Sequence, residues 1–279
     1  MNRLFEKYIK KESLPTIFCP GCGNGIIQYA AMEAMEKLGC KDDVACVSGI
    51  GCSSWIPCYY KLDVIHTMHG RALPFAEGLK LARPDKKILV FTGDGDCVAI
   101  GGNHLLHAAA RNIDLTVVLV NNNIYGMTGG QKSPTTPMGA KTKTSPFGCI
   151  DMPIDAVNLV MALNASYVAR WTTAHPVQMA KSIAEGMEHK GFSFIEVISQ
   201  CPVQAGKNIW GEKVPAKIMD MFKKNTYLVK QGEPYPAGGK GTGEDNEGKL
   251  PIGVFRNDSS IPEYLEKVEA KLAESGIER

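Results

Sequence analysis

Residues 88–96 read ILVFTGDGD, and this stretch decides the fold. Its first four residues are apolar and rich in strand formers, so they predict a short buried β-strand. The Gly-Asp-Gly turn then ends the strand, because glycine lets the backbone bend sharply. A second apolar run, 115–120, ends at another polar group, the asparagines 121–123. We therefore predict two successive strands, each followed by polar residues at its carboxyl end.

Strand patterns alternate with helical patterns along most of the chain. Such alternation implies a mostly parallel sheet with helices on both faces, an α/β fold. In these folds ligands bind beyond the carboxyl ends of the strands. The predicted strands are 44–47, 88–91, 115–120, 167–171 and 194–198, and the predicted helices are 25–38, 73–82, 103–111, 156–163 and 176–189.

The patterns weaken in the last quarter of the chain. Residues 231–249 are rich in glycine, proline and charge, which is typical of a mobile loop or a wrapping arm. A helical pattern resumes at 261–275. A chain of 279 residues with 44% hydrophobic content can bury one sizeable core. We predict one domain over residues 1–205 and a C-terminal extension, loop-rich and then helical, over residues 206–279.

The composition excludes several classes of function. The 31 basic and 29 acidic residues nearly cancel and form no long basic run, so we expect no nucleic-acid partner. Residues 1–13 lack the apolar core of a signal peptide, and no apolar run approaches the ~20 residues of a membrane span. We therefore expect a cytoplasmic protein with no membrane partner. Its nine cysteines are then expected to serve as thiols, metal ligands or redox groups.

The two polar strand ends suit a magnesium site. A carboxylate, an amide oxygen and a backbone carbonyl are hard ligands of the kind that Mg²⁺ prefers, together with water and phosphate oxygens. Glycines beside Asp94 let a phosphate approach the backbone closely. Gly-Asp-Gly alone is a common turn, and the asparagines 27 to 29 residues later give the pattern its specificity.

Four cysteines occupy suggestive positions. Cys19 and Cys22 form a C-x-x-C loop, Cys52 lies among glycines after a predicted strand, and Cys201 precedes a proline after another strand. Four thiolates suit either zinc or an iron-sulfur cluster. Cys58 is a rival to Cys52, which we prefer because flexible glycines flank it. The others are expected to be small buried hydrophobes: Cys40, Cys46, Cys97 and Cys149.

Five motifs together resemble the beta subunit of 2-oxoacid:ferredoxin oxidoreductases. They are weak individually and specific in combination, and the resemblance spans residues 15–205. The C-terminal quarter carries no assignable motif. The motifs are CPGCG at 19–23, GIGCSS at 49–54, HGRA at 69–72, GDGD at 93–96 and NNNIYGMTGGQ at 121–131.

The resemblance implies three cofactors: thiamine diphosphate, Mg²⁺ and a 4Fe-4S cluster. It assigns Mg²⁺ to the side chains of Asp94 and Asn122 and to the carbonyl of Ile124. It assigns the cluster to Cys19, Cys22, Cys52 and Cys201. The residues that it places around thiamine diphosphate are Ile50, Gly51, Cys52, Ser53, His69, Gly70, Gly93, Asp94, Gly95, Asp96, Asn122, Ile124, Gly126, Met127, Thr128 and Gln131.

The resemblance also implies a reaction and partners. The reaction is oxidative decarboxylation of a 2-oxoacid with coenzyme A to acyl-CoA and CO₂, with electrons passing through the cluster to ferredoxin. Met-Thr-Gly-Gly at 127–130 resembles enzymes of 2-oxoglutarate, and a branched-chain 2-oxoacid stays open. The glutamate that activates thiamine is expected on an alpha subunit with a pyrimidine-binding domain, so no catalytic residue is assigned here. Further small subunits are compatible with this organisation.

Two other functions stay open on the sequence. One is a thiamine-dependent decarboxylase or synthase subunit whose cysteines are incidental, which iron and sulfide analysis would distinguish. The other is a zinc-binding interaction module without catalysis, which Mg²⁺-dependent binding of thiamine diphosphate would eliminate. A nicotinamide cofactor is not expected, because no G-x-G-x-x-G opens a helix after a strand.

Overall fold

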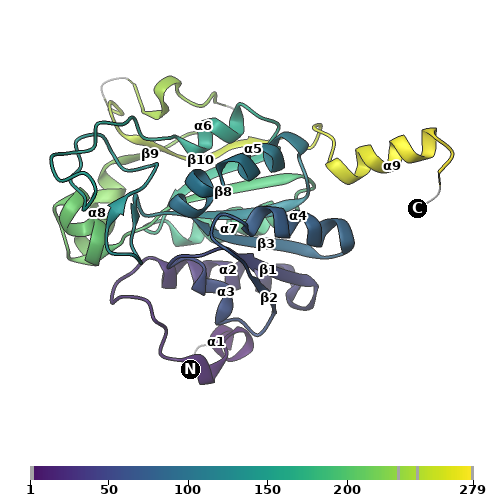
Figure 1. Ribbon diagram of the computed structural model, residues 1–279, viewed down its shortest axis with the longest axis horizontal. Coiled ribbons are helices and arrows are strands. Elements are labelled where there is room, and N and C mark those ends of the chain that lie inside the picture. The colour runs from purple at the N-terminus through teal and green to yellow at the C-terminus, as the bar shows by residue number, and fades with distance from the viewer. Residues whose placement is uncertain (1–2, 231–232, 243–244, 278–279) are drawn as a thin grey trace.

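An eight-stranded sheet with the order β2-β1-β3-β4-β8-β7-β10-β9 forms the centre of the molecule (Figure 1). The computed structural model describes residues 3–230, 233–242 and 245–277. The six strands from β2 to β7 are parallel, and β10 runs antiparallel to β7. The predicted α/β class is confirmed. The strands are β1 (Val44–Ser48), β2 (Asp63–His66), β3 (Lys87–Gly93), β4 (Leu115–Asn121), β7 (Tyr167–Thr172), β8 (Phe192–Ile198), β9 (Thr226–Leu228) and β10 (Leu250–Asn257).

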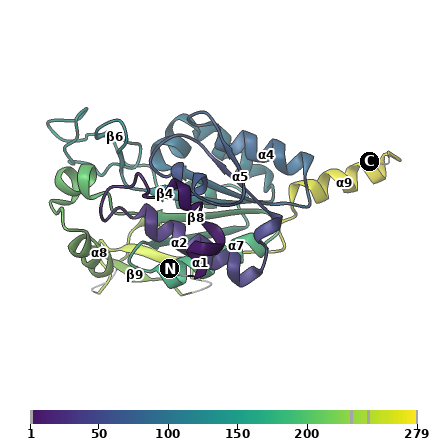
Figure 2. The ribbon, with the colours of Figure 1, turned by 90° about the horizontal axis from the view of Figure 1, so that it is seen from below.

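Helices cover both faces of the sheet, as Figure 2 shows from the side. Side chains alternate along each strand, so Leu89 and Phe91 of β3 enter one core while Ile88 and Val90 enter the other. Among the described residues, no helix is long and apolar enough to cross a bilayer. One face carries α1 (Arg3–Tyr8), α2 (Asn24–Leu38), α3 (Trp55–Cys58) and α7 (Pro176–Glu188), and the other carries α4 (Ala72–Ala82), α5 (Gly102–Arg111) and α6 (Ala156–Met161).

Local signals in the sequence explain where the main helices begin and end. Gly39 ends α2 in the left-handed region, at a φ of 62°, as the glycine after residue 38 predicts. Pro176 opens α7, where its missing N–H costs nothing. The predicted helices and strands of residues 25–198 are confirmed to within about two residues at each end, as is usual for such boundaries.

The C-terminal part is more ordered than the sequence predicts. It adds a wide helical segment, the π-helix Pro202–Trp210, together with α8 (Pro215–Lys224) and the strands β9 and β10. The predicted loop covers only residues 231–249, and no element was predicted for β10, whose Pro251 and Gly253 weaken the strand pattern and whose register shifts at Val254. The helix α9 (Tyr264–Glu274) projects from the body (Figure 1). The division into parts 1–205 and 206–279 stays a prediction, although one sheet contains strands from both.

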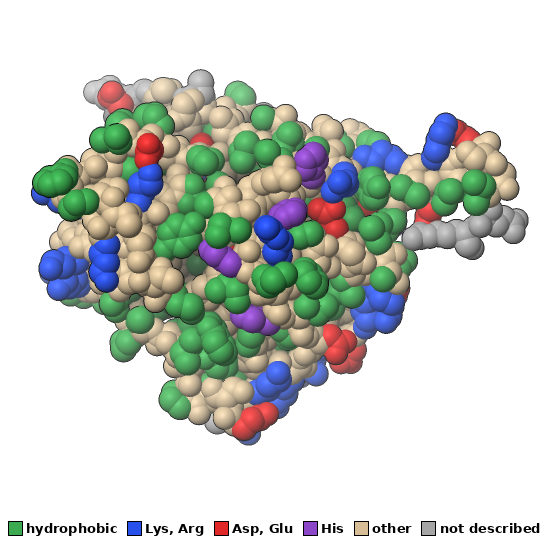
Figure 3. Space-filling model, in the orientation of Figure 1, with side chains coloured by type: hydrophobic (Ala, Val, Ile, Leu, Met, Phe, Trp, Pro, Cys, Tyr) green, Lys and Arg blue, Asp and Glu red, His purple; other side chains and the backbone are tan. Residues whose placement is uncertain are grey.

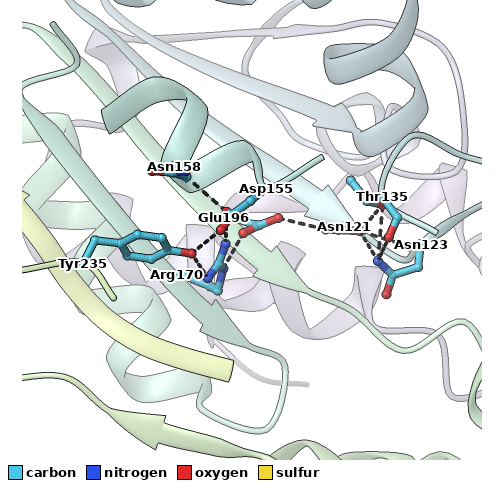
Figure 4. A network of polar contacts seen from close by, with 8 residues as sticks. All are labelled: Asn121, Asn123, Thr135, Asp155, Asn158, Arg170, Glu196 and Tyr235. Carbon is cyan, nitrogen blue, oxygen red and sulfur yellow. Dashed lines mark hydrogen bonds and ion pairs between the residues drawn. The ribbon is translucent and has the colours of Figure 1, made fainter. Parts of the chain in front are cut away.

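A buried arginine ties the last strands to the middle of the sheet (Figure 4). Arg170 on β7 donates to Glu196 on β8 at 2.5 Å, to Asp155 at 2.6 Å and to the hydroxyl of Tyr235 at 2.8 Å. Glu196 in turn accepts from the amide of Asn121 at 2.8 Å. The guanidinium thus joins β7, β8, the start of α6 and the segment after β9.

We predict that Arg170→Ala lowers the free energy of unfolding by about 3–5 kcal/mol, because it leaves carboxylates in the interior without a counter-charge. Chemical denaturation followed by circular dichroism measures this change. The matched control is Arg83→Ala, because Arg83 also binds a carboxylate, that of Asp85, but on the surface. Equal stabilities of the two variants would contradict the prediction.

Candidate functional site

Five loops meet at the carboxyl edge of five neighbouring parallel strands. They follow β2, β1, β3, β4 and β8, which are consecutive in the sheet. The chain leaves β1 toward β2 on one side and leaves β3 toward β4 on the other, so a crevice opens between the ends of β1 and β3. The C-x-x-C loop joins the same edge, since the N–H of Gly23 donates to the carbonyl of Gln200 at 3.0 Å. The edge therefore collects all five sequence motifs.

Asp96 connects three of these loops. Its carboxylate is 2% exposed. The Oδ1 atom accepts from the backbone N–H of Gly70 at 2.7 Å and of Ile50 at 3.2 Å, and it lies 2.6 Å from Nδ1 of His69. The Oδ2 atom accepts from the hydroxyl of Thr92 at 2.6 Å. Its role in cofactor binding stays a prediction, and in the structure its two oxygens contact protein donors that hold the loops in place.

A glycine beside Asp96 makes this arrangement possible. A Cβ atom on Gly49 would lie 2.1 Å from Oδ2 of Asp96, well inside contact distance. Gly70 has a φ of 72°, in the region that favours glycine, and its own Cβ would meet Ile100 at 2.2 Å. Gly49 of GIGCSS is therefore required for close packing on the carboxylate, and Gly70 of HGRA for close packing on Ile100.

A first cavity, which we call the Asp94 cavity, lies among these loops. It is lined by every residue predicted to bind the cofactor except two, together with Val120 and Tyr125. The two exceptions lie next to lining residues. The N–H of Gly70 donates to Asp96, and the side chain of Gln131 donates to the carbonyl of Thr128 at 2.9 Å. Its lining residues are Ile50, Gly51, Cys52, Ser53, His69, Gly93, Asp94, Gly95, Asp96, Val120, Asn122, Ile124, Tyr125, Gly126, Met127 and Thr128.

Tyr125 is a lining residue that the sequence analysis did not assign. It belongs to the short strand β5 (Ile124–Tyr125), which pairs with β6 (Gln131–Lys132). Its hydroxyl donates to the carbonyl of Gly95 at 3.2 Å, and its ring occupies the place where a Cβ on Gly95 would lie. The second glycine of Gly-Asp-Gly therefore makes room for this ring, and the adjacent Ile-Tyr-Gly sequence was the available signal.

Asp94 is buried at the floor of the cavity with 2% of its surface exposed. Its Oδ2 accepts from the hydroxyl of Ser133 at 2.6 Å and lies 2.5 Å from that of Thr135. Burial raises the pKa of Asp94 to about 6, although these hydroxyls favour the ionised form. No local pattern indicates the contacts of Ser133 and Thr135 with Asp94, because the two residues lie about 40 positions away in the chain. Asn122 lines the cavity too, and its Oδ1 accepts from the N–H of Ile124 at 3.2 Å.

A second cavity, the cysteine cavity, has a volume of about 240 Å³ and is lined by all four predicted cluster ligands, Cys19, Cys22, Cys52 and Cys201. Burial raises the pKa of the Cys22 thiol to about 12 and that of Cys52 to about 11, and repulsion from the neighbouring thiolates adds to both shifts. A cationic centre would reverse this effect, because metals bind the deprotonated thiol.

Cys58, the rival ligand, faces elsewhere. It lies on α3, where its Sγ contacts the carbonyl of Ser54 at 3.5 Å and Nδ1 of His66 at 3.6 Å. Four other cysteines are buried, as predicted: Cys40, Cys46, Cys97 and Cys149. Over the described residues, no three His, Cys, Asp or Glu side chains form a group that could hold a single metal ion.

A thin wall separates the two cavities. Cys52, Asn122, Gly126 and Met127 line both of them. A Cβ on Gly126 would lie 3.7 Å from Sγ of Cys201 and 3.9 Å from Sγ of Cys52, so this glycine backbone passes directly beside two of the thiols. Groups bound in the two cavities would therefore be close neighbours.

The chain is similar to known proteins in sequence and in structure. The family described as thiamine pyrophosphate enzyme, C-terminal TPP binding domain, matches residues 46–197. The 2-oxoglutarate synthase subunit KorB of Methanocaldococcus jannaschii is 49% identical over 94% of this chain and 94% of its own length. The 2-oxoacid:ferredoxin oxidoreductase subunit beta of a Sulfolobus species is 34% identical over 91% of this chain and 85% of its own length. This chain belongs to the beta subunits of the 2-oxoacid:ferredoxin oxidoreductases.

A solved structure agrees with this assignment. The 2-oxoglutarate:ferredoxin oxidoreductase from Magnetococcus marinus, determined with 2-oxoglutarate, coenzyme A and succinyl-CoA bound, matches with a TM-score of 0.85 and 31% identity. The match covers 98% of this chain and 91% of that one. The resemblance seen in the sequence is confirmed. This beta subunit carries a thiamine diphosphate-binding domain and is one part of an oxidoreductase with several subunits.

We predict that Asp96→Asn weakens both folding and cofactor binding. The amide nitrogen would face N–H and O–H donors, and each buried donor left unpaired costs about 1–3 kcal/mol. Thermal denaturation and calorimetric titration with thiamine diphosphate measure the two effects, and we expect an affinity loss of at least about tenfold.

The control for Asp96→Asn is Asp151→Asn, because Asp151 pairs with Lys132 at an exposed position. This control should retain the melting temperature and the affinity for thiamine diphosphate. A variant Asp96→Asn that binds as tightly as the unaltered chain would show that the three loops do not depend on the carboxylate.

Proposed function

We propose that this beta subunit holds thiamine diphosphate and Mg²⁺ in the Asp94 cavity and a 4Fe-4S cluster in the cysteine cavity. In the assembled enzyme it would serve the coenzyme A-dependent oxidative decarboxylation of 2-oxoglutarate, with ferredoxin as the electron acceptor. The observation that carries this proposal is the wall that the two cavities share. When bound, thiamine diphosphate supplies an electron sink for decarboxylation and the cluster accepts electrons one at a time.

The residues of the Asp94 cavity fit a magnesium diphosphate. Asp94 and Asn122 would supply a carboxylate and an amide oxygen, and Ile124 a backbone carbonyl, all hard donors. Ser133 and Thr135 fix one oxygen of Asp94, so the carboxylate cannot rotate freely. Asp96 holds the backbone of Ile50 and Gly70, and thereby the walls on either side. These residues would orient the cofactor and hold the Mg²⁺ that offsets its negative charge.

The raised pKa of Asp94 predicts a pH dependence of cofactor binding. Mg²⁺ requires the ionised carboxylate, so Mg²⁺-dependent binding of thiamine diphosphate should weaken about tenfold for each pH unit below 6. In the absence of Mg²⁺, the pH dependence of folding stability has the opposite sign to that of cofactor binding. The contribution of Asp94 to stability is full below its unfolded pKa near 4 and is lost as the pH rises through about 6.

Calorimetric titrations between pH 5 and pH 8 measure this pH dependence of binding. The variant Asp94→Asn should bind thiamine diphosphate weakly at every pH. Its affinity should not depend on pH in this range, because an amide does not titrate. An affinity of the unaltered chain that stays constant down to pH 5 would contradict the assignment of Asp94 as a magnesium ligand.

The cysteine cavity fits a cluster. Four thiols from three separate segments line a space much larger than the ~30 Å³ that one water molecule occupies in the liquid. The backbone N–H of Asn24 forms a hydrogen bond that stabilises the thiolate of Cys22. Such hydrogen bonds to sulfur tune the potential of iron-sulfur centres. Cys52 serves both cavities, since its neighbours Ile50, Gly51 and Ser53 line the Asp94 cavity.

We predict that Cys52→Ser loses most of the iron and the broad visible absorbance of protein purified without oxygen, whereas Cys58→Ser retains both. The two substitutions remove one thiol each, from positions six residues apart, and in the structure only Cys52 faces the cysteine cavity. Iron and acid-labile sulfide analysis measures the difference. A colourless, zinc-loaded wild type would refute the cluster and favour a structural zinc site.

Lys143 supports a dicarboxylic substrate such as 2-oxoglutarate. Its Nζ would lie 2.7 Å from a Cβ atom added at Gly129. Its backbone N–H donates to the carbonyl of Gly130 at 2.9 Å. In the described part of the chain no carboxylate forms an ion pair with Lys143, whereas Lys132 pairs with Asp151. Thr128, next to Gly129, lines the Asp94 cavity. An ammonium at this rim can receive the distal carboxylate of the substrate.

Apolar side chains around the mouth of the Asp94 cavity support an alpha-subunit partner. Ile50 and Met127 line the cavity and are exposed. Further exposed apolar side chains belong to segments next to its lining residues: Trp55, Met68 and Ile100. Figure 3 shows hydrophobic side chains beside histidines near the middle of the face in view. Large apolar side chains gathered on a surface are typical of a contact with another chain. The alpha subunit would bring the activating glutamate, and we propose a cytoplasmic complex that can include further small subunits.

The experiment that tests this function compares the isolated chain with the complex co-purified without oxygen. The complex should oxidise 2-oxoglutarate with coenzyme A and reduce ferredoxin, with pyruvate turned over less efficiently. The isolated chain should show no turnover, because the activating glutamate is missing. Substrate loss and succinyl-CoA formation are followed by mass spectrometry. Sustained turnover by the isolated chain would overturn the proposed division of labour.

A further inference from the structure

The cysteine cavity opens to the surface on the side away from the Asp94 cavity. Cys19 is exposed, whereas Cys52 lies in the shared wall. The outer rim contains Ile17 and Val203, which are both more than half exposed. Electrons that leave a cluster in this cavity without returning to thiamine therefore have their shortest exit through this rim.

The helix α8 extends this rim. Pro215, its first residue, packs on the C-x-x-C loop so closely that a Cβ on Gly21 would lie 2.1 Å from its Cγ. The wide helical segment Pro202–Trp210 follows Cys201 directly, and Trp210 packs edge-on against Phe222 of α8 with ring centroids 5.4 Å apart. The rim and α8 are thus one packed unit beside the cysteine cavity.

This unit is strongly basic. Residues 202–224 hold five lysines and two acidic residues in a chain whose net charge is only +2. One of the acids, Glu212, is already engaged: its Oε1 accepts from the N–H groups of Lys213 and Val214 at 2.8 Å each, and its Oε2 lies 3.6 Å from Nζ of Lys217. Figure 3 shows Lys and Arg side chains at the end of the molecule where Figure 1 places α8.

Most of this positive charge is free to act on a partner. Lys207, Lys213, Lys223 and Lys224 are exposed, and none of them forms an ion pair within the described residues. Val214 is exposed among them. An apolar centre with a charged rim is the usual composition of a transient protein interface, and uncompensated charge accelerates the approach of an oppositely charged partner.

We propose that this α8 face, formed by Ile17, Val203, Lys207, Lys213, Val214, Lys217, Lys223 and Lys224, docks a small acidic iron-sulfur electron carrier of the ferredoxin type. The inference rests on the proposed function, because it takes the cysteine cavity as the site of the cluster. Charge complementarity selects an acidic partner, and the position of the face brings that partner to the exposed side of Cys19.

The test uses the assembled complex with Lys207→Glu and Lys213→Glu combined. The Kd for an acidic two-cluster ferredoxin, measured by calorimetry at low ionic strength, should rise at least about tenfold, and its dependence on salt should weaken. The rate of methyl viologen reduction with 2-oxoglutarate should not change, because a small dye needs no docking face. The matched control combines Lys190→Glu and Lys271→Glu, two exposed lysines near α9 at the other end of the molecule.

Three results would overturn the docking proposal. Ferredoxin could bind the Lys207 and Lys213 variant as tightly as the wild type, or the control could weaken binding equally. The variant complex could also lose a subunit, which would make the α8 face a permanent contact. A wild-type complex that reduces no dye with any 2-oxoacid would instead refute the proposed function, and the comparison of ferredoxin affinities would still decide the role of the face.

Discussion

The hydrogen bonds accepted by the buried carboxylate of Asp96 constrain the rest of the site. Parallel strands deliver their loops to one edge of a sheet, but the sheet alone does not fix how those loops face one another. Asp96 supplies that constraint, since backbone groups of Ile50 and Gly70, the ring of His69 and the hydroxyl of Thr92 all contact it. A buried acceptor in a medium of low dielectric holds its donors firmly, because an unpaired group there is costly.

Asp96 holds the loop after β1 through the N–H of Ile50, and this loop also keeps the two cavities close together. Cys52 follows two residues later and takes part in the wall, together with Gly126 from the loop after β4. A side chain at Gly126 would contact the sulfurs of Cys52 and Cys201. Because Gly126 carries no side chain, the wall is thin at this point, and a short separation favours electron transfer between two bound groups.

Much of this site could be predicted from the sequence, because the signals are local. The strand that ends at Gly93 and the next one that ends at Asn121 are buried and apolar, and sheet geometry alone brings their ends together. The contacts that were missed depend on chain folding over long separations. Thr135 reaches Asp94 from 41 residues away, and nothing in its own neighbourhood indicates this. Strand β10 was missed because proline and glycine obscure its pattern, and its place beside β7 is set by tertiary pairing.

We propose that the two cavities hold a thiamine cofactor and an iron-sulfur cluster close enough to exchange electrons. Electron paramagnetic resonance of the oxygen-free complex, frozen after 2-oxoglutarate is added without ferredoxin, tests it most directly. In the wild-type complex the substrate should produce the signal of a reduced 4Fe-4S cluster. A complex with Cys58→Ser should give the same signal, and one with Cys52→Ser should give none. Substrate consumption by the wild-type complex with no such signal, or an equal signal from the complex with Cys52→Ser, would contradict it.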